Sequence, residues 1–386
     1  MQIRLITSEQ EFAELAFVWR KLFAANPAHS PFQSWEWNYS WWQHHGTAGQ
    51  LRLLIGEHDG EIAGLAPLCL QRSFRGLPQA HLSFISRKRG DYLDFLTVPG
   101  KAAEFFTALF AYLKEQHGGW SFLDLSDLHR DSPNVLQVLA AANLVFPTAT
   151  VEAREICVTV PLTSTWETFQ AGLGKNARRN IGRYGRALEK DFKVEFRVPV
   201  GREQMQQGLS DFAAVYRGRW QDEHGKTYFD DADAMAFERQ LCELATGQSW
   251  YRLYLLYADE QPIAGYLGYI CNNKYYAGLL AHVPQFHKYS VGTVLIGKTV
   301  EDCIAQGWTE LDMTRGNEPY KFQWNGVAKR NFHVRIFASR FALLRVALVD
   351  WIYWRATEMT WLHRLRAALR RAAAPKSKDA TPPPAE

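Results

Sequence analysis

Two short patterns occur twice in this sequence, in the same order. Residues 52–64 read RLLIGEHDGEIAG and return at 252–265 as RLYLLYADEQPIAG. Residues 119–126 read GWSFLDLS and return at 307–314 as GWTELDMT. Two independent matches in one order indicate a tandem duplication. We therefore predict two domains of similar fold, a first copy over 1–155 and a second copy over 156–339.

Each copy reads as a hairpin, a further strand, a long helix and another strand. Alternating apolar runs broken by turn residues predict the hairpins, and a glycine closes each predicted helix. In the second copy we predict strands at 250–258, 262–271, 274–283, 309–313 and 329–338, and a helix at 292–306. Antiparallel strands followed by one strand–helix–strand crossover predict an α/β fold with a mixed sheet in each copy.

Composition narrows the class of protein. Hydrophobic residues make up 47% of the chain, which is enough for two packed cores. The five cysteines lie far apart and form no redox or metal-binding motif, so we expect reduced thiols and no metal. Because the amino terminus has no signal-peptide pattern and the net charge is only +4, we expect a cytoplasmic protein that does not bind DNA.

Two further segments frame the duplicated region, FQSWEW at 32–37 and GNEPYKF at 316–322. Together with the order of elements they resemble the GNAT acetyltransferase fold in a doubled form. Such a form is similar to the CelD-like and Fem-type (FemAB-like) transferases, bacterial proteins associated with exopolysaccharide or peptidoglycan assembly. The resemblance covers nearly the whole chain. It implies an acyltransferase with acetyl-CoA or another acyl-CoA as donor, and a working site mainly in the second copy.

The loop HKYSVGT at 287–293 leads into the long helix of the second copy. A helix amino terminus offers unpaired N–H groups and partial positive charge, which suit a pyrophosphate. In the resembling family this loop cradles the CoA pyrophosphate, with glycine where Ser290 and Gly292 stand here. The implied donor contacts are His287, Lys288, Ser290, Val291, Gly292 and Thr293. The alternatives are a helix start that binds no ligand, or a donor other than CoA.

Polar residues gather where the strand ending near Asp312 gives way to a loop, and strand ends are where open α/β sheets bind ligands. Acyl transfer needs a base, an acid for the leaving thiolate and a donor for the oxyanion. We assign Glu318 or Asp312 as the base. The resemblance implies Tyr320 as the acid and Lys321 as the oxyanion donor. A purely structural role for Asp312 stays open, because Asp124 holds the same place in the first copy.

Further residues are predicted to bind substrate. A basic segment at 175–186 reads as a helix, and arginine side chains bind phosphate through two parallel hydrogen bonds. The segment RGDYLDF at 89–95 resembles a loop that faces the groove between the copies in the related transferases. The predicted contacts are Lys175, Arg178, Arg179, Arg315, Asp91 and Asp94. A solvated surface helix and turn-forming aspartates are the alternatives.

The carboxyl-terminal part mixes tryptophan, leucine and arginine over 340–373. Charges interrupt its apolar run too often for a transmembrane helix. We predict an amphipathic basic helix that lies on the inner membrane surface or packs over the domain junction. Residues 374–386 are rich in proline and polar residues, and we expect them to be disordered.

The sequence thus predicts transfer of an acyl group, acetyl by default, from CoA to an amine or hydroxyl of a saccharide or cell-envelope precursor. We expect direct transfer, because no Cys or Ser nucleophile with a partner His is apparent. One alternative keeps the fold and takes an aminoacyl-tRNA as donor, which makes RNA a partner. The other is a non-catalytic pair of domains that binds polysaccharide or serves as a scaffold.

Overall fold

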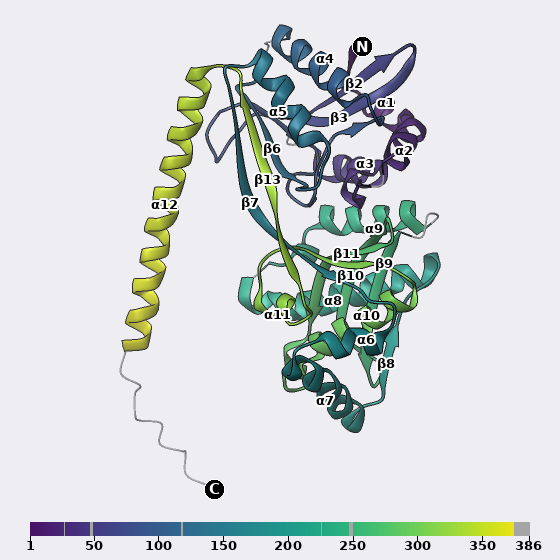
Figure 1. Cartoon of the computed structure of the whole chain (residues 1–386). Helices are drawn as coiled ribbons and strands as arrows, with labels where there is room; N and C mark the ends of the chain where they lie inside the picture. The colour runs from purple at the N-terminus through teal and green to yellow at the C-terminus, as the bar shows by residue number, and fades with distance from the viewer. Residues whose placement is uncertain (27, 47–48, 117–118, 225, 247–249, 374–386) are drawn as a thin grey trace.

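The computed structural model of the chain describes residues 1–26, 28–46, 49–116, 119–224, 226–246 and 250–373 (Figure 1). The predicted tail, 374–386, lies outside the described residues. The strands are β1 (Gln2–Ile6), β2 (Gly49–His58), β3 (Glu61–Gln71), β4 (His81–Phe84), β5 (Leu96–Thr97), β6 (Phe122–Leu128), β7 (Thr148–Pro161), β8 (Val194–Arg197), β9 (Tyr251–Ala258), β10 (Gln261–Cys271), β11 (Lys274–His282), β12 (Glu310–Arg315) and β13 (Val327–Phe337).

The helices of the described residues alternate with these strands. They are α1 (Glu9–Glu14), α2 (Ala16–Ala24), η1 (Pro31–Gln33), α3 (Trp35–His45), α4 (Ala102–Glu115), α5 (Asn134–Val145), α6 (Trp166–Gly172), α7 (Lys175–Asp191), α8 (Arg202–His224), η3 (Tyr228–Asp230), α9 (Ala232–Thr246), η4 (Pro284–Tyr289), α10 (Val291–Ala305), α11 (Pro319–Phe322) and α12 (Arg340–Ala373). The η elements are short 3₁₀ helices.

The described strands form one 13-stranded sheet in the order β1-β2-β3-β4-β6-β13-β7-β12-β11-β10-β9-β8, with β5 beside β3. Two neighbouring pairs in it are parallel, β4 with β6 and β11 with β12, and each pair belongs to one copy. The other pairs are antiparallel, which confirms the predicted mixed α/β architecture. The predicted second-copy elements agree with β9 to β13 and α10 to within two residues at nearly every end.

The two copies exchange their last strands. The strand β7 begins in the first copy, and its end, from Cys157 to Pro161, pairs with β12 of the second copy; the end of β13, from the second copy, pairs with β6 of the first. Between these contacts β7 and β13 pair with each other, and Figure 1 shows them running side by side through both halves of the molecule. Each copy's sheet is therefore completed by the other copy, and the predicted boundary at 155/156 lies inside β7.

Turn residues fix the register of the hairpins. Asp259 and Glu260 both have positive φ, as do Asn272 and Asn273, and Asp59 is followed by Gly60 in the same conformation. Two consecutive positive φ values define the type I′ turn, whose twist matches that of the flanking strands. These turns join β2 to β3, β9 to β10 and β10 to β11 as antiparallel hairpins.

The second-copy sheet is covered by helices on both faces. Along β9, Leu253 and Leu255 enter one apolar cluster with α8 and α9, whereas Tyr254 and Leu256 enter another with α10. This alternation follows from the two-residue period of a strand. The α9 helix also packs on α3 of the first copy, where the ring centroids of Trp37 and Phe237 lie 5.2 Å apart. The first cluster thus continues through both copies.

The long α12 helix stands at one side of the molecule and extends away from the sheet (Figure 1). Its first turns pack on the body through Val346 and Val349, which join Phe74, Phe122 and Phe337 in a small apolar cluster. Among the described helices, none is long and apolar enough to cross a membrane.

Candidate active site

The parallel strands β11 and β12 diverge at the centre of the second copy. Their backbones pair from Lys274–Glu310 to Tyr276–Asp312, and no further pair between them is present among the described residues. Beyond this point the Thr314 hydroxyl donates to the Ala277 carbonyl at 2.9 Å. The carboxyl ends of both strands therefore open toward the loop that begins α10, which is where an open α/β sheet binds ligands.

Asp312 stands at the point of divergence and is 2% exposed. Its Oδ1 atom accepts hydrogen bonds from the Tyr92 hydroxyl at 2.7 Å and from the Thr314 N–H at 2.8 Å. Burial raises the pKa of Asp312 to about 7, although these two hydrogen bonds act to lower it. A carboxyl with a pKa in this range suits a general base at neutral pH.

The pKa of Asp124, the matching residue of the first copy, is shifted in the opposite direction. Asp124 forms an ion pair with Arg87 at 2.8 Å, and its Oδ1 accepts hydrogen bonds from His333 Nε2 at 2.5 Å and Arg335 Nε at 3.0 Å. Burial acts to raise the pKa of Asp124, but the His333 hydrogen bond and the two arginine charges outweigh it and hold the pKa well below its usual range. The two aspartates thus share a position in the repeat but not an environment.

The loop after β12 holds the other predicted catalytic residues. Lys321 is 3% exposed, and its ammonium donates to the Arg315 carbonyl at 2.7 Å and to the Gly316 carbonyl at 3.3 Å. It also lies 3.1 Å from a carboxylate oxygen of Glu318. All three ammonium protons therefore have acceptors in the loop that Lys321 stabilises, and this geometry does not favour the oxyanion-donor role expected from the sequence.

Glu318 and Tyr320 differ in burial. The Glu318 side chain is 53% exposed, whereas burial, followed by the nearby charge of Glu318, raises the pKa of Tyr320 to about 12. The Tyr320 phenol is therefore protonated at neutral pH, as an acid for a leaving thiolate must be. Gly316, at φ 114°, allows Glu318 to turn back over the loop, since a Cβ there would lie 2.4 Å from the Glu318 carboxylate.

The predicted donor loop forms a left-handed turn at the start of α10. Ser290 has φ 46° and ψ 49°, a conformation that glycine adopts without strain. Its N–H donates to the His287 carbonyl at 3.0 Å, while its carbonyl accepts from Thr293 at 2.8 Å and Val294 at 3.2 Å. Within the described part of the chain this leaves the N–H groups of Val291 and Gly292 without a partner.

Side chains of the donor loop divide between solvent and core. His287 and Lys288 are exposed, whereas the Val291 side chain is fully buried, so Val291 can offer a ligand only its backbone. At Gly292 an added Cβ would meet nothing closer than 3.5 Å, so this glycine leaves a small open space before α10. The loop thus presents two backbone donors and two exposed cationic or polar side chains.

The basic helix α7 packs against α10. The Tyr184 hydroxyl is hydrogen-bonded to Ser290, which lowers the pKa of Tyr184, and the Tyr289 hydroxyl donates to Asp191 at 2.6 Å. Exposed cations follow the helical period on one face of α7. They are Lys175, Arg178, Arg179, Arg183 and Arg186. Arg183 and Arg186 flank Tyr184, whereas the three cations chosen from the sequence lie on the turns nearer the start of α7.

These five cations have no ion-pair partner within the described residues, and Arg183 stacks on the Tyr184 ring at 4.6 Å. An unpaired basic face beside two free N–H groups attracts polyanions such as phosphates.

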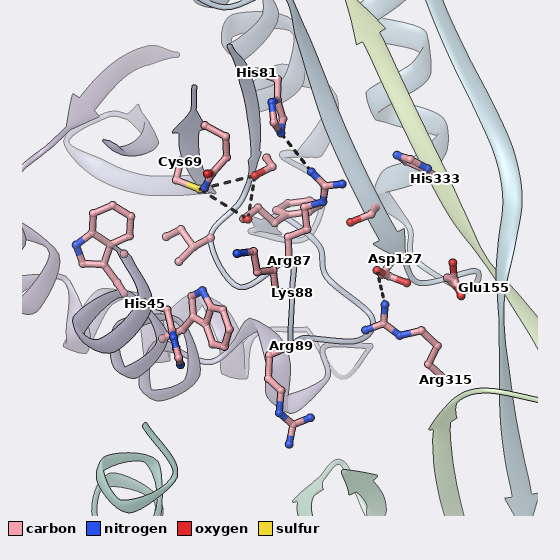
Figure 2. A pocket seen from close by; sticks show the side chains of 18 of the residues that line it. His45, Cys69, His81, Arg87, Lys88, Arg89, Asp127, Glu155, Arg315 and His333 are labelled. Carbon is pink, nitrogen blue, oxygen red and sulfur yellow. Dashed lines mark hydrogen bonds and ion pairs between the residues drawn. The ribbon is translucent and has the colours of Figure 1, made fainter. Parts of the chain in front are cut away.

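A large cavity of about 1040 Å³ lies between the copies, not at α10. Its wall includes Trp41 and Trp42 of α3, the segment after β4, and parts of β7, β13 and α9. Figure 2 shows Arg87 and Lys88 reaching into this space, with Arg315 and Asp127 beside each other at one side. Arg315 therefore connects the cavity to the loop after β12.

Arg315 joins two carboxylates of the first copy. Its Nε lies 2.8 Å from Asp91 Oδ1, and its Nη1 lies 3.4 Å from Asp127 Oδ2. Asp127 is 4% exposed, and its Oδ1 has no hydrogen-bond partner among the described residues. Burial raises the pKa of Asp127 to about 7, although the charge of Arg315 acts to lower it. Sequence reasoning chose Asp91 and Arg315 but missed Asp127, which stands at the Arg315 position of the first repeat.

Asp94 does not belong to this group. It accepts from the Phe95 N–H at 2.8 Å, from the Asn134 amide at 3.1 Å and from the Ser132 hydroxyl. Burial raises the pKa of Asp94 to about 6. These partners lie inside the first copy and Asp94 does not line the cavity, so the structure shows only local contacts for it; its contact with an acceptor stays a prediction.

No group of three or more His, Cys, Asp or Glu side chains within the described ranges is arranged to hold a metal ion. The five cysteines form no disulfide, and all but Cys271 are buried.

The fold and the family match together define the class of protein. Residues 175–322, which carry α7, the loop before α10 and the loop after β12, match the family model described as the acetyltransferase (GNAT) domain. The chain is accordingly an enzyme that transfers acyl groups, which disfavours the non-catalytic alternative.

Particular solved structures share the fold over nearly the whole chain. FemX matches with a TM-score of 0.58 and 13% identity over 86% of this chain and 97% of its own. The C-terminal domain of a putative lysylphosphatidylglycerol synthetase from Agrobacterium fabrum matches with a TM-score of 0.55 and 11% identity over 88% of this chain and 95% of its own. At these identities the likeness concerns the fold alone. Among curated proteins, none matches this sequence.

Proposed function

We propose that the protein transfers an acyl group, acetyl by default, from CoA to an amine or hydroxyl of a saccharide or cell-envelope precursor such as one for exopolysaccharide. The observation that carries this proposal is the start of α10, where the unpaired N–H groups of Val291 and Gly292 lie beside the basic face of α7. The resemblance to CelD-like proteins motivates the choice of acceptor.

The donor fits the second copy in two respects. The pyrophosphate would accept hydrogen bonds from the first N–H groups of α10, where the helix dipole also favours negative charge. The acyl carbonyl would lie in the gap between β11 and β12, where the described residues give β11 no strand partner on one side beyond Tyr276. Unpaired backbone N–H groups there would stabilise the oxyanion, a role that Lys321 is poorly placed to fill.

The acceptor fits the cavity between the copies. Its volume of about 1040 Å³ is at the upper end of ordinary ligand pockets, which are roughly 300–1000 Å³. Trp41 and Trp42 line the cavity although each is only 8% exposed, and Arg87 and Lys88 offer donors to the polar groups of a sugar. Arg315 brings this space to the carboxyl end of β12.

In the proposed reaction the acceptor nitrogen or oxygen attacks the acyl carbonyl while a carboxylate removes its proton. Asp127 is the first candidate for this base, because it lines the cavity, its buried Oδ1 has no hydrogen-bond partner among the described residues, and its pKa is raised to about 7. Glu318 and Asp312 are the candidates from the sequence. Collapse of the intermediate forms the new amide or ester and releases the CoA thiolate, which takes the Tyr320 phenol proton.

Calorimetric titration of the purified protein with acetyl-CoA, and separately with CoA, tests the donor. We expect micromolar binding of both ligands. Gly292→Glu should weaken it by at least about tenfold, which corresponds to 1.4 kcal/mol, because the new carboxylate lies beside the pyrophosphate. The change is sterically mild, since nothing lies within 3.5 Å of the new Cβ. Thr107→Glu, on an exposed position of α4, is the matched control.

The donor proposal is wrong if neither ligand binds, or if Gly292→Glu binds as tightly as the wild type. A second candidate donor, an aminoacyl-tRNA, is favoured by the length of the basic face. From Lys175 to Arg186 this face spans about 17 Å at the 1.5 Å helical rise, more than a single pyrophosphate requires. Binding of tRNA whose affinity falls linearly with the logarithm of salt concentration, without CoA binding, would select this donor.

A further inference from the structure

The outward side of α12 carries a stripe of large apolar side chains. Phe341, Leu344, Leu348, Trp351 and Ile352 are between 47% and 69% exposed. Their spacing of three, four, three and one residues places all five on one side of a helix. Single exposed apolar residues are common on protein surfaces, but a continuous stripe of this size marks a binding surface.

The opposite side of α12 fixes the orientation of this stripe. Val346 and Val349 pack on the body of the molecule, and Asp350 forms ion pairs with Arg75 at 2.6 Å and Arg335 at 2.5 Å. The Arg75 guanidinium also lies 4.1 Å from the centre of the Tyr353 ring. Because the inner side is held by these contacts, the stripe faces away from the protein.

The charge of α12 points to the kind of partner. The helix has seven arginines and only two acidic residues, Asp350 and Glu358. Asp350 is directed toward Arg75 and Arg335 of the body, so it does not offset the arginines beside the stripe. Among these, Arg345 lies within the stripe's span, and Arg355 lies 5.8 Å from the Trp351 ring. A partner must therefore offer both an apolar layer that can bury these side chains and negative charge.

We propose that the outward side of α12, here called the α12 stripe and defined by Phe341, Leu344, Leu348, Trp351 and Ile352, lies on an anionic lipid surface. The apolar side chains enter the boundary between headgroups and acyl chains, and the arginines contact lipid phosphates. A second copy of α12 is the less suitable partner, because it would bring its own seven arginines against these. The inference goes beyond the proposed reaction and does not depend on its donor or acceptor.

Cosedimentation of the full-length protein with vesicles tests this surface. The probes are phosphatidylcholine vesicles and vesicles that contain phosphatidylglycerol as the anionic lipid. We expect binding to the anionic vesicles at least about tenfold tighter than to the neutral ones, and weakened at high salt, because surface charges are then screened. Leu344→Glu/Leu348→Glu should reduce anionic binding by about tenfold or more.

The first copy supplies a matched control. Leu136 and Leu144 on α5 are 77% and 82% exposed, so Leu136→Glu/Leu144→Glu makes the same chemical change on another exposed helix. This control should bind anionic vesicles like the wild type. All variants change exposed positions, and equal thermal unfolding midpoints will verify that they fold. The proposal is overturned if the wild type binds anionic vesicles no better than the stripe variant does. It is equally overturned if the stripe variant only converts a dimer to a monomer in sedimentation velocity.

Discussion

Replacing Asp312 by Asn tests whether burial raises the pKa of the Asp312 carboxyl in the folded protein. The side chain is 2% exposed, and its Oδ1 accepts from Tyr92 at 2.7 Å and Thr314 at 2.8 Å. Asn keeps an oxygen for both donors and has nearly the same volume, so it removes only the ability to ionise. The variant should therefore fold with the same contacts and differ from the wild type mainly in its pH dependence.

The pKa of Asp312 sets the sign and size of the change in unfolding free energy with pH. Burial raises the pKa of Asp312 from 3.8 to about 7, so between these values the folded protein holds a proton that the unfolded chain has released. The free energy of unfolding of the wild type must then fall as pH rises. From pH 5 to pH 8 this shift amounts to roughly two pKa units, or about 2–3 kcal/mol at 1.36 kcal/mol per unit. The unfolding free energy of Asp312→Asn should not show this fall with pH.

Urea denaturation of both proteins at pH 5 and pH 8 measures the difference. Other titrating groups, Asp127 among them, occur in both proteins and cancel. A difference in unfolding free energy that does not change with pH would refute the raised pKa of Asp312. Acyl transfer by Asp312→Asn at the wild-type rate would remove this residue from the candidate bases.

Three further substitutions address the site. Asp127→Asn should abolish the rise of activity through about pH 7 that a base of this pKa produces, and a retained rise in the pH–rate profile would exclude Asp127. Gly316→Ala should lower the unfolding free energy by about 1–3 kcal/mol, because φ is 114° there, whereas helical Gly185→Ala should raise it by about 0.5–1 kcal/mol. Lys321→Met should cost about 2–4 kcal/mol in the same denaturation assay by leaving the carbonyls of Arg315 and Gly316 without their donor, and a smaller loss than that of Glu318→Gln would contradict this structural role.

The repeated elements could be predicted because local signals encode them. Alternating apolar residues and pairs such as Asn272-Asn273 predict hairpins without reference to the rest of the chain, and β9 to β11 follow these predictions. The exchange of β7 and β13 could not be predicted in this way. An apolar strand pairs equally well with either of two matching edges, and the choice depends on how the copies dock.

The different surroundings of Asp124 and Asp312 also could not be predicted from local sequence. Their local sequences, GWSFLDLS and GWTELDMT, share the Gly, Trp, Leu and Asp positions, so the repeat alone favours one shared structural role. What separates them comes from distant segments, Tyr92 at Asp312, and Arg87 and His333 at Asp124. A pKa depends on this assembled environment, which no local pattern contains.

Asp127 could have been found from the sequence only by reading the repeat differently. It stands at the position of Arg315 in the other copy, and these two side chains of opposite charge meet between the copies. The cavity could not be predicted from the sequence, because its wall is formed by segments of both copies that are far apart in the chain.

Hydrogen exchange in the presence of acetyl-CoA tests the central claim, a donor site at the start of α10, most directly. The amide groups of Val291 and Gly292 are predicted to exchange more slowly with acetyl-CoA bound, because the pyrophosphate would accept their hydrogen bonds. Protection of the segment 284–294, absent in Gly292→Glu, is the expected result. Protection confined to the first copy, around β4 and β6, would contradict the claim and move the donor to the other copy.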